Sequence, residues 1–238
     1  MNRFWNWETV RDEAEQSEKR VLHLEGVIAS EAWWNDEVSP RVFKEELEAG
    51  SGPIDVWINS PGGDVFAGAQ IYNMLMDYPH DVIVKIDGIA ASAASVIAMA
   101  GTTVCMSPVG MMMIHNPSTS AWGDSAEMKK AIKMLDEVKE SIINAYEIKT
   151  YLTRDQISRL MDAESWFNAK KAVELGFADK ILFDGKPVDA NSVSVQNSFI
   201  YAKNDFDASV LKKLIPPKEE KRVPVESLEK RLDLIKPF

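Results

Sequence analysis

Short β-type runs alternate with helical patterns from about residue 20 onward, and this alternation restricts the possible folds more than any other feature. Parallel strands need long crossover connections, which are usually helices, so the alternation predicts an α/β domain built on a largely parallel sheet. The predicted strands are rich in Val, Ile and Met and cover 20–28, 54–59, 81–88, 102–107 and 110–115.

Helical periodicity occupies the connections between those strands. In 64–79 apolar residues recur at helical spacing, and Pro79 should end that helix. The longest pattern, 125–149, has an apolar stripe that we expect to face the core: Met128, Ile132, Leu135, Val138, Ile142 and Tyr146. Capping residues mark the helix ends: Asp124 for this helix, Thr153 with Gln156 for a helix at 154–161, and Asn168 for a last helix that Gly176 terminates.

The composition excludes several classes of protein. The 238 residues carry 27 Lys and Arg against 37 Asp and Glu, a formal charge of −10 that repels nucleic acid and anionic lipid alike. The single cysteine, Cys105, cannot form an internal disulfide, and the sequence shows neither a membrane-spanning apolar run nor a signal peptide. We therefore expect a cytoplasmic protein without nucleic-acid or membrane partners, and no cofactor or metal.

The texture of the chain changes along its length and suggests three parts. Residues 1–19 form an N-terminal segment, and 20–183 hold all the predicted strands and helices. Residues 184–238 are rich first in turn-forming residues and then in proline and charge, so we interpret them as a partly irregular C-terminal extension.

The stretch "DGIAASAASVIAMAG", residues 87–101, holds two serines in an apolar setting. Ser92 falls where a strand becomes a helix, a place where backbone N–H groups can point at a developing oxyanion. Ser95 lies one turn further and is expected to pack in the helix and bond its own backbone. The alanines of "AASAA" do not fit the G-x-S-x-G elbow of α/β-hydrolases, so spacing alone leaves Ser92 either a nucleophile or a buried small residue.

A nucleophilic serine needs a base, and the sequence has only three histidines. His23 lies in a predicted strand and His80 in a turn after a helix. His115 ends the apolar run "GMMMIHNP", where a sheet delivers side chains to its edge, so it is either the base or a strand-end histidine. The Gly-Gly pair of "NSPGGDVFAGAQ" lets a substrate approach the backbone closely, although alone it also fits a tight turn.

Three segments in this order and spacing, "INSPGGDVFAG", "DGIAASAAS" and "MMMIHNP", resemble the signature segments of the Clp protease proteolytic subunit (ClpP) family of serine endopeptidases. The resemblance covers 20–183 and implies a ClpP/crotonase-like α/β fold, a spiral ββα superhelix in a single domain with a C-terminal extension. The start "FWNW", the segment "MDAESWFNAKKAVELGFAD" and the tail resemble the Clp-related head maturation proteases of tailed phages and prophages.

The resemblance implies a role for each matched residue. Ser92 would be the nucleophile and His115 the general base, while the backbone N–H groups of Gly63 and Ala93 would form the oxyanion hole.

The third member of the triad departs from the family pattern. Register from the final helix places the family's aspartate at Glu164, which reaches one methylene further, and Asp162 is the alternative acid. Both acids also fit solvated loop charges.

The resemblance further implies partners. Members of this family form heptameric rings, usually stacked as double rings, and 125–149 would correspond to the helix that joins rings. The start of this chain does not match the family's axial loop, which argues against docking of a Clp-type ATPase. A phage enzyme that processes capsid or scaffold precursors would not need one. The polar segment 116–124 could pair with a peptide substrate by strand addition.

Three other functions fit parts of the sequence. A Ser-Lys peptidase of the signal-peptide-peptidase type shares the architecture and would use Lys85 or Lys129 as its base. A catalytically silent assembly scaffold is suggested by the altered acid at Glu164 and by the tail. A crotonase-type acyl-CoA enzyme shares the fold, but it has no use for a Ser-His pair, and no basic cluster for CoA is evident.

Overall fold

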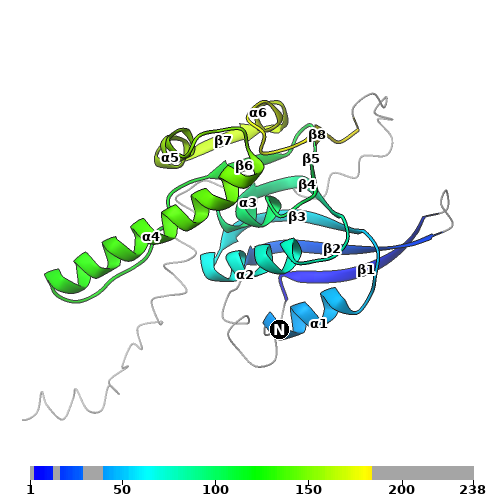
Figure 1. Ribbon diagram of the computed structural model, residues 1–238, viewed down its shortest axis with the longest axis horizontal. Coiled ribbons are helices and arrows are strands. Elements are labelled where there is room, and N and C mark those ends of the chain that lie inside the picture. Colours follow the sequence, from blue (N-terminus) through cyan, green and yellow to red (C-terminus); the bar gives the residue numbers. More distant parts are fainter. Residues whose placement is uncertain (1–2, 13–16, 29–39, 184–238) are drawn as a thin grey trace, which may run out of the picture. The chain divides into compact units, whose positions relative to one another are not determined.

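The computed structural model describes residues 3–12, 17–28 and 40–183, and its central element is one mixed sheet (Figure 1). Its strands are β1 (Trp5–Asp12), β2 (Ser17–Ile28), β3 (Ile54–Gly63), β4 (Val82–Ala91), β5 (Thr103–Met106), β6 (Met111–Ile114), β7 (Ser165–Asn168) and β8 (Lys180–Ile181). They lie in the order β1-β2-β3-β4-β5-β8, with β6 pairing to β4 and β7 to β6. Only β1–β2 and β6–β7 are antiparallel, which confirms the predicted α/β fold with a largely parallel sheet.

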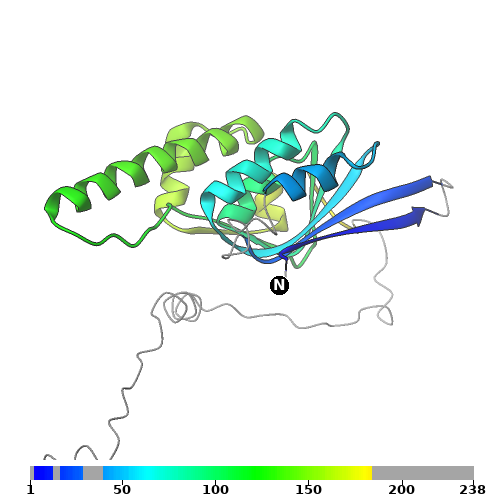
Figure 2. The ribbon, with the colours of Figure 1, turned by 90° about the horizontal axis from the view of Figure 1, so that it is seen from below.

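Helices lie in the connections between the strands. They are α1 (Pro40–Glu48), α2 (Val65–Met76), α3 (Ala93–Ala98), α4 (Ser125–Lys149), α5 (Arg154–Asp162) and α6 (Ala169–Glu174). Figure 2 shows α1 and α2 together on one face of the sheet. The predicted caps are confirmed: Asp124 accepts from the first-turn amides of α4, Thr153 and Gln156 form a reciprocal capping box, and Asn168 caps α6.

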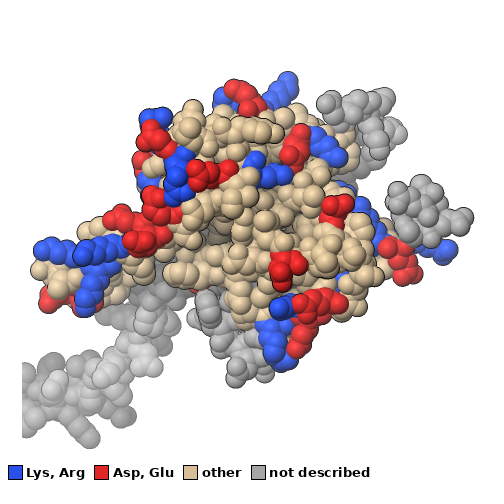
Figure 3. Space-filling model, viewed as in Figure 1, with Lys and Arg blue, Asp and Glu red and all other residues tan. Residues whose placement is uncertain are grey.

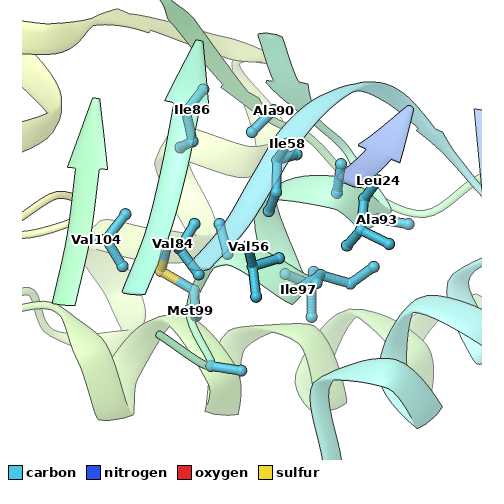
Figure 4. Close-up of a cluster of buried hydrophobic side chains, with 14 of the residues drawn as sticks. Leu24, Val56, Ile58, Val84, Ile86, Ala90, Ala93, Ile97, Met99 and Val104 are labelled. Atoms are coloured by element: carbon cyan, nitrogen blue, oxygen red, sulfur yellow. The ribbon is translucent and has the colours of Figure 1, made fainter. Parts of the chain in front are cut away.

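The core lies between the helices and the sheet. Every second residue of the central strands points into it, because side chains alternate between the two faces of a strand. Burial of each such aliphatic side chain contributes about 1.5–3 kcal/mol to stability. Figure 4 shows Val56 and Ile58 of β3, Val84 and Ile86 of β4 and Val104 of β5 packed with Ala93 and Ile97 of α3.

Strand β4 changes partners along its length, and this branching positions the site described below. Its first half, from Ile83 to Ile86, pairs with β5, whereas Ile89 to Ala91 pair with β6. Gly88 lies between the two halves, where a Cβ would come within 2.4 Å of the Asn59 side-chain oxygen. The far end of β4 thus has β6 rather than β5 as its neighbour.

The prediction that the whole apolar stripe of α4 faces the core is wrong for its first half. Ile142 and Tyr146 are buried, but Ile132 is 58% exposed. Figure 1 shows the reason: the first half of α4 extends past the edge of the sheet, so no sheet lies beneath it among the described residues.

Four elements were not predicted: β1, α1, β7 and β8. β1 falls within the expected N-terminal segment, where tryptophans alternate with polar residues. Trp5 is buried against Phe43 of α1, and Trp7 lies under the Arg20 guanidinium at 4.3 Å. The expected C-terminal extension, 184–238, lies outside the described residues.

Within the described ranges, no helix combines the length and the apolar character needed to cross a membrane. Nor do those residues contain a cluster of three or more His, Cys, Asp or Glu side chains that could hold a metal ion.

Candidate active site

Ser92 connects β4 to α3 and occupies the N-cap position of that helix, with φ 54° and ψ −126°. Residues other than glycine rarely adopt this conformation, and holding it costs about 1–3 kcal/mol. Serine is a favoured N-cap residue, yet the Ser92 hydroxyl makes no capping hydrogen bond. The Ser92 amide donates to the Met113 carbonyl at 2.9 Å, which ties the turn to β6.

His115 directly follows β6, and the structure brings it to Ser92. Ala91, the last residue of β4, pairs with Met113, so Ser92, one residue further, and His115, two residues beyond Met113, leave the sheet at the same edge. His115 Nε2 lies 2.7 Å from Ser92 Oγ, and both residues are half-buried. A neutral imidazole with a lone pair on Nε2 can accept the hydroxyl proton in this geometry.

The glycine pair forms the end of β3 and lies against the Ser92 turn. Gly62 and Gly63 have positive φ angles of 95° and 154°. A Cβ on Gly62 would lie 2.7 Å from Ser92 Cβ and 3.0 Å from the Ala93 nitrogen. A Cβ on Gly63 would lie 2.1 Å from the Ile28 carbonyl oxygen. Neither position has room for a side chain, so bare backbone borders the nucleophile turn.

The two expected oxyanion donors both belong to this pair of turns. Ala93 is the first residue of α3, where amides find no acceptor within the helix. The Gly62 amide donates to Ser60 Oγ at 3.1 Å and is therefore engaged inside its own turn. The Gly63 amide, one residue on, lies at the end of β3 opposite Ile28.

Glu164 lies directly before β7 and is half-buried, with φ 48°. Strands β6 and β7 are antiparallel, with Ile114 opposite Ser165. One further step in this register sets His115 opposite Glu164. Residues facing each other in antiparallel strands have Cβ atoms about 4.5–5.5 Å apart. The sheet thus brings the Glu164 backbone alongside the histidine.

Asp162, the alternative acid, is engaged elsewhere. Its Oδ1 accepts hydrogen bonds from Lys139 Nζ at 2.5 Å and from Asn116 Nδ2 at 2.8 Å. The Lys139 bond, and after it the Asn116 bond, hold the pKa of Asp162 below its ordinary value. Asp162 therefore anchors the residue after His115 to the end of α5, and the geometry favours Glu164 as the acid.

The other candidate bases lie away from Ser92. Lys85 Nζ donates to the buried carboxylate of Asp55 at 2.7 Å and lies 5.1 Å from the centre of the Trp57 ring. That ion pair holds the only lysine of β4 away from the nucleophile. The remaining candidates are on other elements: His23 in β2, His80 after α2, and Lys129 on α4.

Comparison with known protein families agrees with this arrangement. A family model described as Clp protease matches residues 12–185. The chain belongs to the Clp protease family. The matched range spans both glycine and serine turns, His115 and both candidate acids. This Clp protease is accordingly a serine-type endopeptidase of mixed α/β fold.

Curated relatives support the same assignment. The ATP-dependent Clp protease proteolytic subunit 2 of Thermobifida fusca is 32% identical over 174 residues, which are 71% of this chain and 85% of that protein. Subunit 1 of Corynebacterium jeikeium is 29% identical over 170 residues, 71% of this chain and 89% of the relative. The proteolytic subunit of Porphyromonas gingivalis is 33% identical over 131 residues, 54% of this chain and 59% of that protein.

Sequence reasoning missed several residues that shape the site of this Clp protease. Gly62 packs on the nucleophile turn, Met113 contributes its carbonyl, and Asn116 links the histidine segment to α5. Only Gly62 left a signal, as the first glycine of the "PGG" turn. The roles of the other two depend on a carbonyl direction and on a contact across 46 residues of chain.

Proposed function

We propose that this Clp protease cuts peptide bonds with Ser92 as the nucleophile, His115 as the general base, and Glu164 as the acid that orients the imidazole. The observation that carries the proposal is the 2.7 Å contact between His115 Nε2 and Ser92 Oγ at a strained turn. A serine held at positive φ beside a base is costly to maintain, and such strain clusters at active sites.

In the first half of the reaction Ser92 Oγ attacks the carbonyl carbon of the scissile bond, and its proton passes to His115 Nε2. The carbonyl oxygen becomes an oxyanion, which the N–H groups of Gly63 and Ala93 stabilise. Each such donor is worth about 100- to 1000-fold in turnover. Collapse of the tetrahedral intermediate breaks the C–N bond, and His115 gives its proton to the leaving amine.

In the second half a water molecule attacks the acyl-enzyme ester, with His115 again taking a proton. The Ser92 oxygen leaves, recovers a proton from the histidine, and the carboxylic acid product departs. A carboxylate at Glu164 stabilises the imidazolium that forms in both halves. Glu164 reaches one methylene further than an aspartate and starts from a backbone with φ 48°.

The neighbouring surface supports binding of an extended peptide. Residues 118–124, after the histidine segment, are exposed and lie outside helices and strands, while Asn116 holds the start of this segment to Asp162. An extended peptide could pair with such a segment through its backbone, and the enzyme would then read side chains only weakly.

We also propose that the chain assembles into rings. On the face shown in Figure 3, charged side chains gather at the rim and along the first half of α4, which extends past the sheet. The centre of this face is largely uncharged. Phe66 is 55% exposed and Ile148 is 69% exposed, and both line a groove between α2 and α4 with a volume of about 540 Å³. Exposed apolar surface of this kind marks protein interfaces.

The natural substrate we propose is a capsid or scaffold precursor of a tailed phage, cleaved in the host cytoplasm during head maturation. The support is the resemblance of the amino-terminal and Glu164 segments to head maturation proteases. In addition, β1 pairs with β2 along its whole length, so the start of the chain is part of the sheet. A Clp-type ATPase is not required by this proposal.

Two measurements test the function. A fluorophosphonate probe should label the native chain at Ser92 and should not label Ser92→Ala or His115→Ala; a His115→Ala chain that reacts at the native rate overturns the mechanism. Co-expression with the capsid gene of a tailed phage should then yield a capsid protein of lower mass only when Ser92 is present. A capsid of unchanged mass beside a labelled Ser92 would instead mean a protease with another substrate, and no labelling at all favours a silent scaffold.

A further inference from the structure

Ser95 and Tyr146 form a buried hydrogen-bonded pair beneath the nucleophile turn. Ser95 is on α3 and Tyr146 near the end of α4, with 0% and 1% of their surfaces exposed. Tyr146 Oη lies 2.8 Å from Ser95 Oγ, and Ser95 Oγ donates to the Ser92 carbonyl at 2.6 Å. Buried polar groups are normally hydrogen-bonded, and both hydroxyls of this pair have partners.

The direction of each hydrogen bond in this chain follows from chemistry. The Ser92 carbonyl can only accept, so the Ser95 hydroxyl proton points toward it. Ser95 Oγ then has only lone pairs left, so Tyr146 must donate. Burial raises the pKa of Tyr146, which keeps its proton in place. The order is Tyr146 to Ser95 to the Ser92 carbonyl, and each bond polarises the next.

The Ser92 carbonyl belongs to the same peptide group as the Ala93 amide. A trans peptide is planar, so its C=O and N–H point in opposite directions and cannot rotate independently. Fixing the direction of the Ser92 carbonyl therefore fixes the direction of the Ala93 N–H. Electron withdrawal by hydrogen bonds to the carbonyl also makes that N–H a stronger donor.

We infer that Ser95 and Tyr146 are positioning residues that hold the Ser92–Ala93 peptide so that the Ala93 N–H points at the oxyanion. The inference rests on the proposed function and adds a support that lies outside the triad. The need for it is local: Ser92 has φ 54°, a region in which a residue with a side chain is not stable on its own. The amides of Ser95 and Val96 also bond the Ser92 carbonyl, at 2.9 and 3.4 Å, so the hydroxyl adds a third contact from a different direction.

The test uses Ser95→Ala, Tyr146→Phe and the double variant in the full chain, with the fluorophosphonate labelling rate and the thermal midpoint Tm measured for each. Ser95→Ala removes the bond to the carbonyl and leaves the Tyr146 hydroxyl buried without that partner, so both rate and Tm should fall. Loosening an oxyanion donor should lower the rate about ten-fold, which is less than losing one outright. Tyr146→Phe, which keeps the Ser95 bond, should lower the rate about two- to three-fold.

The double variant separates positioning from stability. Replacing both partners of a buried hydrogen bond by apolar groups is nearly neutral for stability, so Tm should return close to that of the native chain. The labelling rate should stay at the Ser95→Ala level. A rate that recovers together with Tm, or a Ser95→Ala chain that reacts at the native rate, overturns the inference.

Tyr78→Phe is the matched control. Tyr78 is also buried and donates to a backbone carbonyl, that of Gly52, at 2.8 Å, but it lies at the opposite end of β3 from Gly62. The Tyr78→Phe variant should have a lower Tm than the native chain and the same labelling rate. Should the native chain itself fail to react at Ser92, the proposed function fails instead, so the two failures are distinct.

Discussion

Two neighbouring strand-to-helix turns of this protein solve the same geometric problem in opposite ways. Between β3 and α2 the chain turns on Gly62 and Gly63, and Asp64 then caps the helix by accepting from the Phe66 and Ala67 amides at 2.8 and 3.0 Å. Between β4 and α3 the turn rests on Ser92 alone, at positive φ and without a side-chain cap.

The difference shows where stability has been given up. Glycine tolerates positive φ at no steric cost, and an aspartate cap contributes about 1 kcal/mol to stability. The first turn therefore has the residues that stability favours. The second accepts strain and diverts its hydroxyl from the helix to His115, which is what a nucleophile requires and a cap does not.

The strongest test of this comparison replaces the serine of the β4–α3 turn by glycine, the residue on which the β3–α2 turn is built. Ser92→Gly should abolish turnover, a loss of at least about 10⁴-fold, because the nucleophile is gone. It should also raise the free energy of unfolding by about 1 kcal/mol, because the strain at φ 54° is relieved. Ser92→Ala is the control, since it removes the hydroxyl but keeps the strain. Urea unfolding that gives equal stabilities for the two variants would contradict this account.

In the proposed mechanism, the reactivity of the Ser92 hydroxyl depends on the carboxylate that orients His115. Glu164→Gln removes the charge that stabilises the imidazolium, so kcat should fall about 1000-fold with little change in KM. Asp162→Asn should change kcat far less, because that carboxylate bonds Lys139 and Asn116. If Asp162→Asn caused the larger loss, the acid would have to be reassigned.

A side chain added at Gly62 would collide with the turn that holds Ser92. Gly62→Ala places a Cβ 2.7 Å from Ser92 Cβ, so it should slow labelling of Ser92 about 100-fold and cost about 1–3 kcal/mol of stability. Gly52→Ala is the control, because Gly52 also has positive φ, 89°, but has open space around it. It should cost stability and leave the labelling rate unchanged; equal slowing by both variants would point to backbone strain in general.

Removing the helix cap of the first turn should lower the stability of the fold without lowering the catalytic rate. Asp64→Ala removes the cap of α2 and should lower the free energy of unfolding by about 1 kcal/mol, with kcat within about two-fold of native. Thr153→Ala, which removes the cap of α5, should behave in the same way. A large drop in kcat for Asp64→Ala alone would show that the first turn also takes part in the reaction.

The smallest expected effect concerns pH. Because the pKa of Asp162 is lowered in the folded state, its contribution to stability is present above the ordinary aspartate pKa and is lost as pH falls through the lowered value. Asp162 is half exposed, so the difference between the native chain and Asp162→Asn should be slight at neutral pH. It should vanish in acid, which Tm measured along a pH series would reveal; a gap that widens in acid contradicts the assignment.

Much of the fold followed from local patterns in the sequence. The alternation of strands and helices, and caps such as Asp124 and Asn168, depend on residues close together in the chain, so they could be predicted. The prediction that the apolar stripe of α4 faces the core was wrong at Ile132. Periodicity shows that a helix has an apolar face, but it does not show how far the sheet beneath the helix extends. Strand β7 was missed because its pattern is too short to stand out.

The site likewise has features that local sequence patterns predict and features that depend on contacts between distant residues. Ser92 and His115 could be proposed from the sequence because each lies in a recognisable local motif, and the structure brings the two into contact. The hydrogen bond between Ser95 and Tyr146 was not found, since it joins residues 51 positions apart whose neighbours give no hint of contact. The sequence could not separate Glu164 from Asp162 as the acid, because the pairing of Ile114 with Ser165 and the bond from Lys139 to Asp162 join residues far apart in the chain.

The pairing of Ala91 with Met113 has a consequence for how this enzyme tolerates change. The spacing of Ser92 and His115 is set by a backbone ladder, and ladders shift only by whole residues, with each single step turning every side chain to the other face. Damage to this ladder is therefore all or nothing: the pair keeps its contact or loses it. Ser92 and His115, 23 residues apart in the chain, therefore stay in contact only while the two strands keep this register.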